Sequence, residues 1–449
     1  SQFVLDGRSA LICNSSGNLF CLRTVKCWIR SEDSRSGGLV LDKYKSLTRR
    51  QTLCRDRPLW ASIPGGTVRT RRRTPETEYD VIIVGAGISG ALMSHAFIGK
   101  NLRILMVDRR APVQGSSLAS TAMIQHEIDT PLHVLQKSIG VRNAQRVWQR
   151  SAAAVKQLGR LVHDLDLKCA FQAKKTLFLA GEEYDARALS GEAEARRIAG
   201  LGVDLLSEET LQERFGLNRT AALESAISAS ANPAQLTAAV LRNAGKHGVE
   251  IVSGVEIKEL KEFDESVVLS TSQGALLVAR SVVFCTGYEF LKALANKRQK
   301  VVSTWALASR PRLSRPDWLD KYLVWEGSDP YLYFRSTADG RIVLGGEDDD
   351  TEDAYKDEKK RKLKSKTLAE KLGDLTGISI GEPDFEWSAA FGVTPNGLPM
   401  IGRVPNMKNV FTSMGFGGNG ITFSQIAATL ISSEILDHRD EDWDLFPIF

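Results

Sequence analysis

The stretch YDVIIVGAGISGALMSHAFIGKNLRILMVD, residues 79–108, decides the fold class of this chain. It opens with a short apolar, β-branched run over residues 79–84, which is typical of a buried parallel strand. The run leads into Gly85, Gly87 and Gly90, spaced G-x-G-x-x-G. In that order, the three glycines suit a tight turn, a close approach of the backbone to a pyrophosphate, and close packing of a helix on the strand.

The residues after the glycines complete a dinucleotide-binding unit. A helix is predicted over residues 86–97, with its N-terminus facing the phosphate charge. A second strand over residues 102–107 ends in Asp108, at the distance of about 20 residues where an acid accepts a hydrogen bond from a ribose hydroxyl. This context favours a dinucleotide site over a βαβ unit without a ligand. Arg109 and Arg110 either lie against adenosine or phosphate, or form a solvated pair at the strand end.

Composition places the chain among ordinary globular proteins. With 449 residues, 43% hydrophobic and 25% charged, it can bury a sizeable core, and we expect two domains. No apolar run approaches the roughly 20 residues of a membrane span, so no transmembrane segment is predicted. Residues 348–366 carry charges of both signs, which is typical of a solvated helix face rather than a metal site. The segment also lacks the interleaved aromatic residues that are typical of a nucleic-acid-binding patch.

Residues 1–78 differ from the rest in charge. They hold 15 Lys and Arg against 7 acidic residues, in a Ser- and Arg-rich stretch without helical or strand period that ends in RRRTP at residues 71–75. This pattern predicts a disordered leader with no catalytic role. An organelle-targeting peptide is one alternative, although the seven acidic residues and the length of the stretch fit that class poorly, and a truncated or misassigned start is the other. We expect a cytoplasmic protein, with the leader unexplained.

Four of the six cysteines lie in this leader. Cys13, Cys21, Cys27 and Cys54 are spaced neither as a zinc ribbon nor as a C-x-x-C pair. Reduced, metal-free cysteines are therefore expected.

Beyond the glycine unit, periodicity predicts alternating helices and strands and then an antiparallel sheet. The helices are expected at 130–166, 185–201, 207–215 and 233–247, the strands at 168–180, 250–253 and 276–284 with a hairpin at 255–274, and the antiparallel sheet at 301–346.

Three further motifs carry a family resemblance. They are SSLASTAM at 116–123, VVFCTG at 282–287, and the stretch from WSAAFGVTPNGLPMIG to GFGGNGITFSQIAATLISSEI at 387–435. Together with the glycine unit, they resemble the D-amino-acid-oxidase-like family of FAD-dependent oxidoreductases over roughly residues 79–440. The resemblance implies an α/β fold in which a discontinuous Rossmann-like FAD-binding domain carries an inserted antiparallel-sheet substrate domain. The implied segments are 79–168, 231–300 and 395–449 for the FAD domain, and 169–230 and 301–394 for the substrate domain.

The resemblance also implies which residues bind FAD. The turn GFGGNGIT either begins a helix whose N-terminus faces the flavin, where negative charge develops on reduction, or is a plain loop-to-helix turn. The predicted cofactor residues are Gly85, Ala86, Gly87, Ile88, Ser89, Gly90, Asp108, Arg109, Arg110, Ser117, Ser120, Thr121, Thr286, Gly287, Gly415, Gly417, Gly418, Asn419, Gly420, Ile421 and Thr422. Because the chain has one dinucleotide fingerprint, electrons are expected to leave to oxygen or a quinone-type acceptor.

Two departures from the family bear on substrate and cofactor. Amino-acid and glycine oxidases carry an arginine for the substrate carboxylate in the segment that reads FGVT here, at residues 391–394. Without that guanidinium, bidentate capture of an α-carboxylate loses its usual donor. Ala389 stands where sarcosine-oxidase-like members carry the cysteine that tethers flavin, so we expect noncovalent FAD.

Residues 331–348, YLYFRSTADGRIVLGGED, resemble the tyrosine–arginine strand of γ-glutamylputrescine-oxidase-like amine oxidases. Arg335 is predicted either to meet a remote substrate carboxylate or to pair with Asp339 or Glu347. Tyr331 and Tyr333 share a face of the strand, where they either wall the pocket or pack in the core.

Gln125 and His126 follow the SSLASTAMI segment, which in the family leads toward the flavin ring. His126 is a candidate base or hydrogen-bond donor, with a structural histidine as the alternative. The predicted catalytic or substrate-binding residues are therefore His126, Gln125, Arg335 and Tyr333. The predicted activity is oxidation of the C–N bond of an amine or amino acid. The alternatives are a 2-hydroxy-acid or polyol dehydrogenase and a noncatalytic flavoprotein.

Overall fold

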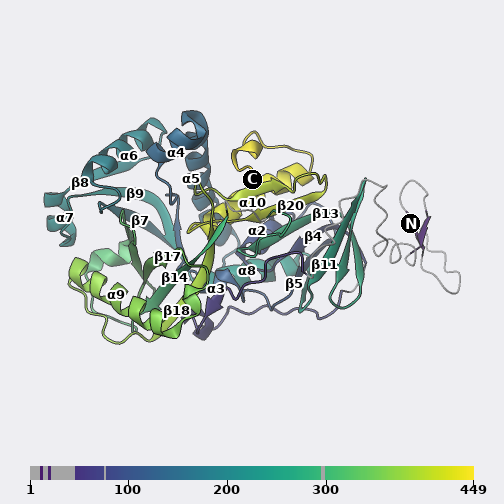
Figure 1. The fold of residues 1–449 in the computed structure, drawn as a ribbon, viewed down its shortest axis with the longest axis horizontal. Helices are drawn as coiled ribbons and strands as arrows, with labels where there is room; N and C mark the ends of the chain where they lie inside the picture. Colours follow the sequence, from purple (N-terminus) through teal and green to yellow (C-terminus); the bar gives the residue numbers. More distant parts are fainter. Residues whose placement is uncertain (1–10, 14–18, 22–45, 75–76, 295–298, 449) are drawn as a thin grey trace.

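The computed structural model describes residues 11–13, 19–21, 46–74, 77–294 and 299–448. Two large sheets, one of eight strands and one of ten, lie next to each other in the molecule (Figure 1). The first is mainly parallel and the second mainly antiparallel, which is the predicted α/β class.

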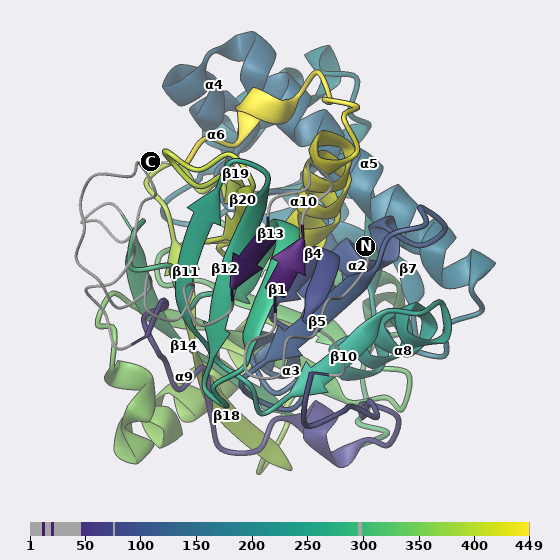
Figure 2. The same cartoon turned by 90° about the vertical axis from the view of Figure 1, so that its right-hand side faces the viewer.

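The eight-stranded sheet is built around β4 (Glu78–Val84), which pairs in parallel with β5 (Ile104–Asp108) and β13 (Leu276–Gly287). Figure 2 shows the strand order from β11 to β10. The other strands are β10 (Glu250–Ser253), β11 (Ile257–Phe263), β12 (Ser266–Thr271), β19 (Met400–Arg403) and β20 (Val410–Met414). Because β4, β5, β13 and β20 run in parallel, their carboxyl ends meet at one edge, where open α/β sheets bind ligands.

Helices cover this sheet. The helix α2 (Ile88–Ala96) contacts both α8 (Pro233–Lys246) and α10 (Gly420–Ile435), and α5 (Val141–Asp164) packs on α10. The single helical stretch predicted over residues 130–166 is two helices, α4 (Leu132–Ile139) and α5, because Gly140 between them has a φ of 85° and ends the first.

The ten-stranded sheet forms the second layer. Its order is β3 (Cys54–Arg55), β18 (Phe385–Val393), β14 (Lys300–Ala308), β17 (Ile342–Asp349), β16 (Leu332–Ser336), β15 (Tyr322–Glu326), β7 (Gln172–Leu179), β9 (Ala221–Ser230) and β6 (Met123–Gln125), with β8 (Val203–Ser207) on β9. The helices on its flanks are α6 (Ala186–Ile198), α7 (Glu208–Phe215) and α9 (Glu358–Thr376). Strand β6 comes from a segment that was predicted for the FAD domain, but it pairs with β9 in the second sheet. The domain boundaries stay predictions.

The predicted disorder of residues 1–78 is wrong for residues 46–74. Leu47 and Arg49 form backbone hydrogen bonds with residues 290–292, β3 adds a strand beside β18, and Arg71 pairs with β10. We call residues 46–55 the strap. The stretch lacks sequence periodicity because its apolar residues, such as Leu47 and Leu53, are buried one at a time along an extended path.

The earlier leader contributes one described feature, an antiparallel pair of β1 (Leu11–Cys13) and β2 (Leu19–Cys21). The remainder of residues 1–45, Cys27 included, lies outside the described residues. Cys54, Cys169 and Cys285 are free thiols. No helix in the described ranges has the length and apolar character needed to cross a membrane, and these ranges hold no cluster of three potential metal ligands from His, Cys, Asp and Glu.

Candidate active site

A continuous cavity begins at the carboxyl edge of the first sheet and reaches the second sheet. We call the part around residues 84–89 and 107–110 its dinucleotide end. The part formed by Gln125, Asp129, Tyr288, Thr304, Trp325, Tyr331, Tyr333 and Phe391 is its aromatic end. The segments 113–121, 284–289 and 416–421 line the cavity as well.

The three glycines of the first turn have different surroundings. A Cβ on Gly85 would lie 2.3 Å from the carbonyl oxygen of Cys285, and one on Gly90 would lie 1.9 Å from that of Gly85. Gly87 lines the cavity and precedes α2 without a side-chain cap. Ser117 accepts from the Ile88 N–H at 2.9 Å, and the N–H groups that follow it in the first turn of α2 face no N-cap side chain, so they can serve an anion such as a pyrophosphate.

Asp108 occupies the predicted position at the end of β5 and lines the cavity. Its carboxylate accepts hydrogen bonds from the backbone N–H groups of Ala86 and Arg110, both at 2.7 Å. Burial raises the pKa of Asp108, and these two bonds oppose the rise. The acid is thus held against the glycine turn, in the cavity wall.

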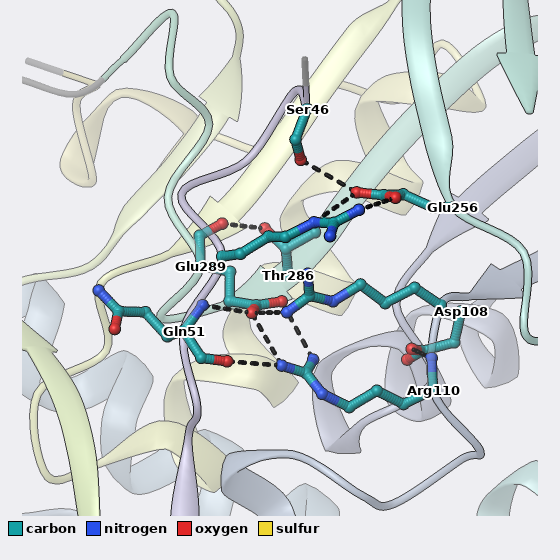
Figure 3. Close-up of polar contacts among 9 residues, drawn as sticks. Ser46, Gln51, Asp108, Arg110, Glu256, Thr286 and Glu289 are labelled. Atoms are coloured by element: carbon teal, nitrogen blue, oxygen red, sulfur yellow. Dashed lines mark hydrogen bonds and ion pairs between the residues drawn. The ribbon is translucent and has the colours of Figure 1, made fainter. Parts of the chain in front are cut away.

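Arg109 and Arg110 form ion pairs, and their shared partner is Glu289 (Figure 3). Glu289 is 4% exposed and also accepts a hydrogen bond from the backbone N–H of Gln51 in the strap, at 2.9 Å. Arg110 donates in turn to the carbonyl oxygen of Gln51, at 2.8 Å. The predicted solvated arginine pair is therefore wrong. The sequence analysis did not identify Glu289, although it lies two residues beyond the VVFCTG motif.

The strap forms part of the cavity wall. Leu47, Thr48 and Leu53 all line it, and Arg50 pairs with Glu256, which is also a lining residue. Ser46 donates to the same carboxylate at 3.0 Å (Figure 3). Part of the predicted noncatalytic leader thus belongs to the wall of this cavity.

Two tyrosines of the second sheet reach the aromatic end. The rings of Tyr331 and Tyr333 have centroids 5.8 Å apart, and a Cβ on Gly345 would lie 2.4 Å from the Tyr333 hydroxyl. Tyr331 donates to Asp348 at 2.8 Å. Burial raises the pKa of Asp348 to about 6, with Asp129 and Asp329 adding to the rise and the hydroxyls of Thr304 and Tyr331 opposing it. The two predicted roles for these tyrosines were to wall the pocket or to pack in the core. The structure places both rings in the cavity wall.

Asp129 lies over the glycine turn before α10. Its Oδ2 accepts from the backbone N–H of Gly418 at 2.8 Å, and burial raises the pKa of its carboxyl while this bond opposes the rise. A Cβ on Gly417 would lie 2.6 Å from the same oxygen. Tyr288 donates to the carbonyl oxygen of Gly417 at 2.6 Å. Asp129 and Tyr288 were missed because neither belongs to a recognised motif.

Gln125 and His126 point to opposite sides of β6. Gln125 lines the cavity, as does Met123, two residues earlier. His126 is fully buried on the other side, where its Nδ1 lies 2.9 Å from the carbonyl oxygen of Ile227 and its ring meets the edge of Trp148. His126 follows the last residue of β6, and it is absent from the cavity lining that Gln125 joins. The structure contradicts its predicted role as a base.

Arg335 does not line the cavity. It donates to the backbone carbonyl oxygens of Thr121, Ser336 and Ala231 at 2.7, 3.1 and 2.9 Å. Because these bonds use donors of the Arg335 guanidinium away from the cavity, the structure does not support the predicted contact with a substrate carboxylate. The predicted pairing of Arg335 with Asp339 or Glu347 is also wrong. Asp339 pairs with Arg341, and Glu347 pairs with Lys364 and Lys371.

Most predicted cofactor residues meet in the cavity wall. Those that line it are Gly85, Gly87, Ile88, Ser89, Asp108, Arg109, Arg110, Ser117, Ser120, Thr121, Thr286, Gly287, Gly417, Gly418, Asn419, Gly420 and Ile421. Ala86, Gly90, Gly415 and Thr422 lie just behind the lining, and Ala86 and Gly90 still shape it through their contacts with Asp108 and Gly85.

Comparison with known proteins agrees with this geometry. The family described as FAD dependent oxidoreductase (DAO) matches residues 80–433. The chain belongs to this family. It is 22% identical over 373 residues to the Bacillus subtilis protein YhfW, whose name describes a Rieske 2Fe-2S iron-sulfur protein, covering 82% of this chain and 70% of YhfW.

Two further relatives are informative. The chain is 23% identical to the bifunctional protein MnmC of Psychrobacter cryohalolentis, named for tRNA 5-methylaminomethyl-2-thiouridine biosynthesis, and the match covers 90% of this chain but 60% of MnmC. Among solved structures, glycine oxidase from Geobacillus kaustophilus superposes with a TM-score of 0.68 at 19% identity, covering 83% of this chain and 99% of the oxidase. The chain therefore shares the oxidase fold and spans only part of MnmC.

The cavity fits the FAD that this family uses. Among the lining residues, the N-termini of α2 and α10, whose N-cap residues make no side-chain cap, offer backbone N–H groups, and Asp108 offers acceptors. The space at the Cβ position of Gly287 is open. The residues around Gly87 would hold the pyrophosphate, and those around Asn419 would face the flavin.

Proposed function

We propose that this protein oxidises a carbon–nitrogen bond of an amine or amino acid by hydride transfer to noncovalently bound FAD. One observation carries the proposal: the cavity that begins at the dinucleotide turn ends among the aromatic side chains of the second sheet. When bound, FAD supplies the redox chemistry. The chain's own residues bind and orient the substrate and exclude water.

Noncovalent binding has two supports. Ala389, at the family's tethering position, lines the cavity without a nucleophile. Cys285, a thiol in the described part of the lining, is buried, and burial raises its pKa to about 12, so it stays protonated at neutral pH.

The fold of the comparison structures is consistent with the proposal, since glycine oxidase acts on an amino acid, as its name states. Flavin reoxidation by oxygen or by a quinone-type acceptor belongs to the proposal. The predicted cytoplasmic location stays a prediction.

The test is anaerobic bleaching of the flavin band by amines, N-methyl amino acids, D-amino acids and 2-hydroxy acids. Bleaching by the nitrogen compounds supports the proposal. Bleaching by 2-hydroxy acids alone would replace it with a dehydrogenase of hydroxy acids, and bound FAD that no compound reduces would favour a noncatalytic flavoprotein. Reoxidation with air or with a soluble quinone then identifies the acceptor class.

A further inference from the structure

Gln125 presents a buried acceptor at the aromatic end. The residue is 7% exposed and lines the cavity, and its Nε2 donates to the carbonyl oxygen of Glu127 at 3.4 Å. Its Oε1 has no partner among the described residues. A buried acceptor without a partner is costly, so this oxygen is suited to accept from a ligand.

Two of the three tyrosines at this end, Tyr331 and Tyr288, also donate their hydroxyl protons to groups of the protein. Tyr331 donates to Asp348, and Tyr288 donates to the carbonyl oxygen of Gly417. Each hydroxyl proton is thus engaged, and the oxygen that remains is an acceptor. Asp348, which contacts the Tyr331 hydroxyl and is not itself part of the lining, keeps one further buried oxygen, Oδ1, with no hydrogen-bond partner in the described structure.

The aromatic end offers a carboxyl and no cationic side chain. Asp129 is the ionisable acid of its described lining, and its backbone donor, Gly418, satisfies one of its two oxygens. The cationic residues of the cavity lining, Arg109 and Arg110, lie at the dinucleotide end and are paired with Glu289. A cationic ligand beside Asp129 would favour the ionised carboxylate, whereas an anionic ligand would disfavour it and would find no guanidinium or ammonium there.

Aromatic faces complete this end of the cavity. Trp325 stacks on Phe178 at a centroid distance of 3.8 Å and stays in the wall together with Tyr331, Tyr333 and Phe391. Such rings attract cations, most strongly where water is excluded.

We propose that the aromatic end binds its ligand as an ammonium ion, with its N–H groups donating to Gln125 and Asp129 and its charge next to the aromatic rings. The substrate class is a cationic amine for which an α-carboxylate adds no affinity. An ammonium has donors and no acceptor, which complements a wall of acceptors, whereas a carboxylate needs donors. This inference rests on the proposed function for its reaction but concerns binding alone.

Three probes of one shape test it: tert-butylammonium, tert-butanol and pivalate. All three carry a trimethyl-substituted carbon without an α-hydrogen, so none can be oxidised at that carbon, and they differ in charge. Binding to the FAD-loaded protein is measured by calorimetry and by the perturbation of the flavin spectrum. We expect the cation to bind at least about tenfold more tightly than either other probe, a difference of about 1.4 kcal/mol.

Two variants assign the preference to residues. Asp129→Asn and Gln125→Met should each reduce the affinity for the cation at least about tenfold. Asp129→Asn removes a charge and should leave the neutral tert-butanol within about twofold, and Gln125→Met removes an acceptor and should leave pivalate, which has no donor, within about twofold. The control is Asp350→Asn, an exposed carboxylate two residues beyond Asp348. If Asp129→Asn fails to retain FAD, Gln125→Met decides the test.

The outcomes separate this inference from the proposed function. Tighter binding of pivalate than of tert-butylammonium, or an unchanged preference in the variants, would overturn the ammonium site even if amines bleach the flavin. Cation-selective binding without bleaching by any amine would support the ammonium site and refute amine oxidation.

Discussion

Replacing Arg196 with methionine is expected to destabilise the protein by about 3 kcal/mol or more. The Arg196 side chain is fully buried, and it donates to Glu192 at 2.7 Å and to Glu127 at 2.8 Å, both also fully buried. Its guanidinium lies 4.6 Å from the centre of the Trp148 ring. Methionine fills similar space but leaves two buried carboxylates without their cation. The backbone carbonyl of Glu127 also accepts from Asn419 at 2.6 Å, so the cluster supports the cavity wall.

The magnitude follows from Glu192. Burial by itself raises the pKa of this carboxyl, but hydrogen bonds from His133 and the charge and hydrogen bond of Arg196 outweigh it and lower the pKa from 4.5 to about 2. One pKa unit corresponds to about 1.4 kcal/mol, so the folded state favours ionised Glu192 by about 3 kcal/mol. Because the folded pKa is lowered, this stability is present above pH 4.5 and is lost as the pH falls toward about 2.

The assay is urea unfolding followed by circular dichroism at neutral pH and at several acid pH values. Arg197→Met is the matched control, because the neighbouring Arg197 is exposed and lies 3.6 Å from Glu194, and such surface pairs are worth about 0.5 kcal/mol. Arg196→Met should lower the free energy of unfolding at neutral pH and flatten its decline in acid. A loss equal to that of Arg197→Met would refute the reasoning.

Three further predictions concern the cavity. Gly90→Ala should abolish FAD retention, because its Cβ would lie 1.9 Å from the carbonyl oxygen of Gly85, whereas Gly191→Ala, with open space around its Cβ, should retain normal flavin content. Leu53→Ala should destabilise the strap by about 2 kcal/mol and speed the release of FAD from the purified protein, as followed by flavin fluorescence. Because the pKa of Asp348 is about 6, affinity for tert-butylammonium should rise as the pH increases through about 6 and the carboxyl ionises. A titration of Asp348→Asn that keeps the same pH dependence would contradict this assignment.

Residues close together in the sequence could be predicted reliably. The strand, glycine turn, helix and acid of residues 79–108 form one local unit, and β4, α2 and β5 occupy it with boundaries shifted by one or two residues. The turn before α10 was also found, since its glycines adjoin an apolar strand.

The roles of single polar residues were predicted less well. Arg335 shares the strand face of Tyr333, yet it lies outside the cavity lining. There, backbone carbonyl oxygens from distant segments accept hydrogen bonds from its guanidinium. His126 follows β6, and its side chain is buried against Ile227 from another strand, a contact that adjacent residues in the sequence do not reveal.

The sequence by itself determined the cofactor unit of this protein, because a dinucleotide turn depends on steric requirements that consecutive residues satisfy. Only the tertiary structure decided the chemistry of the other end. Asp129, Tyr288 and Tyr331 come from separate segments and meet where two sheets adjoin. The strap closes the same cavity from a stretch that lacks any periodic pattern. The charge of a cavity depends on which distant side chains share it and which are neutralised by partners, and that is a property of the packed fold.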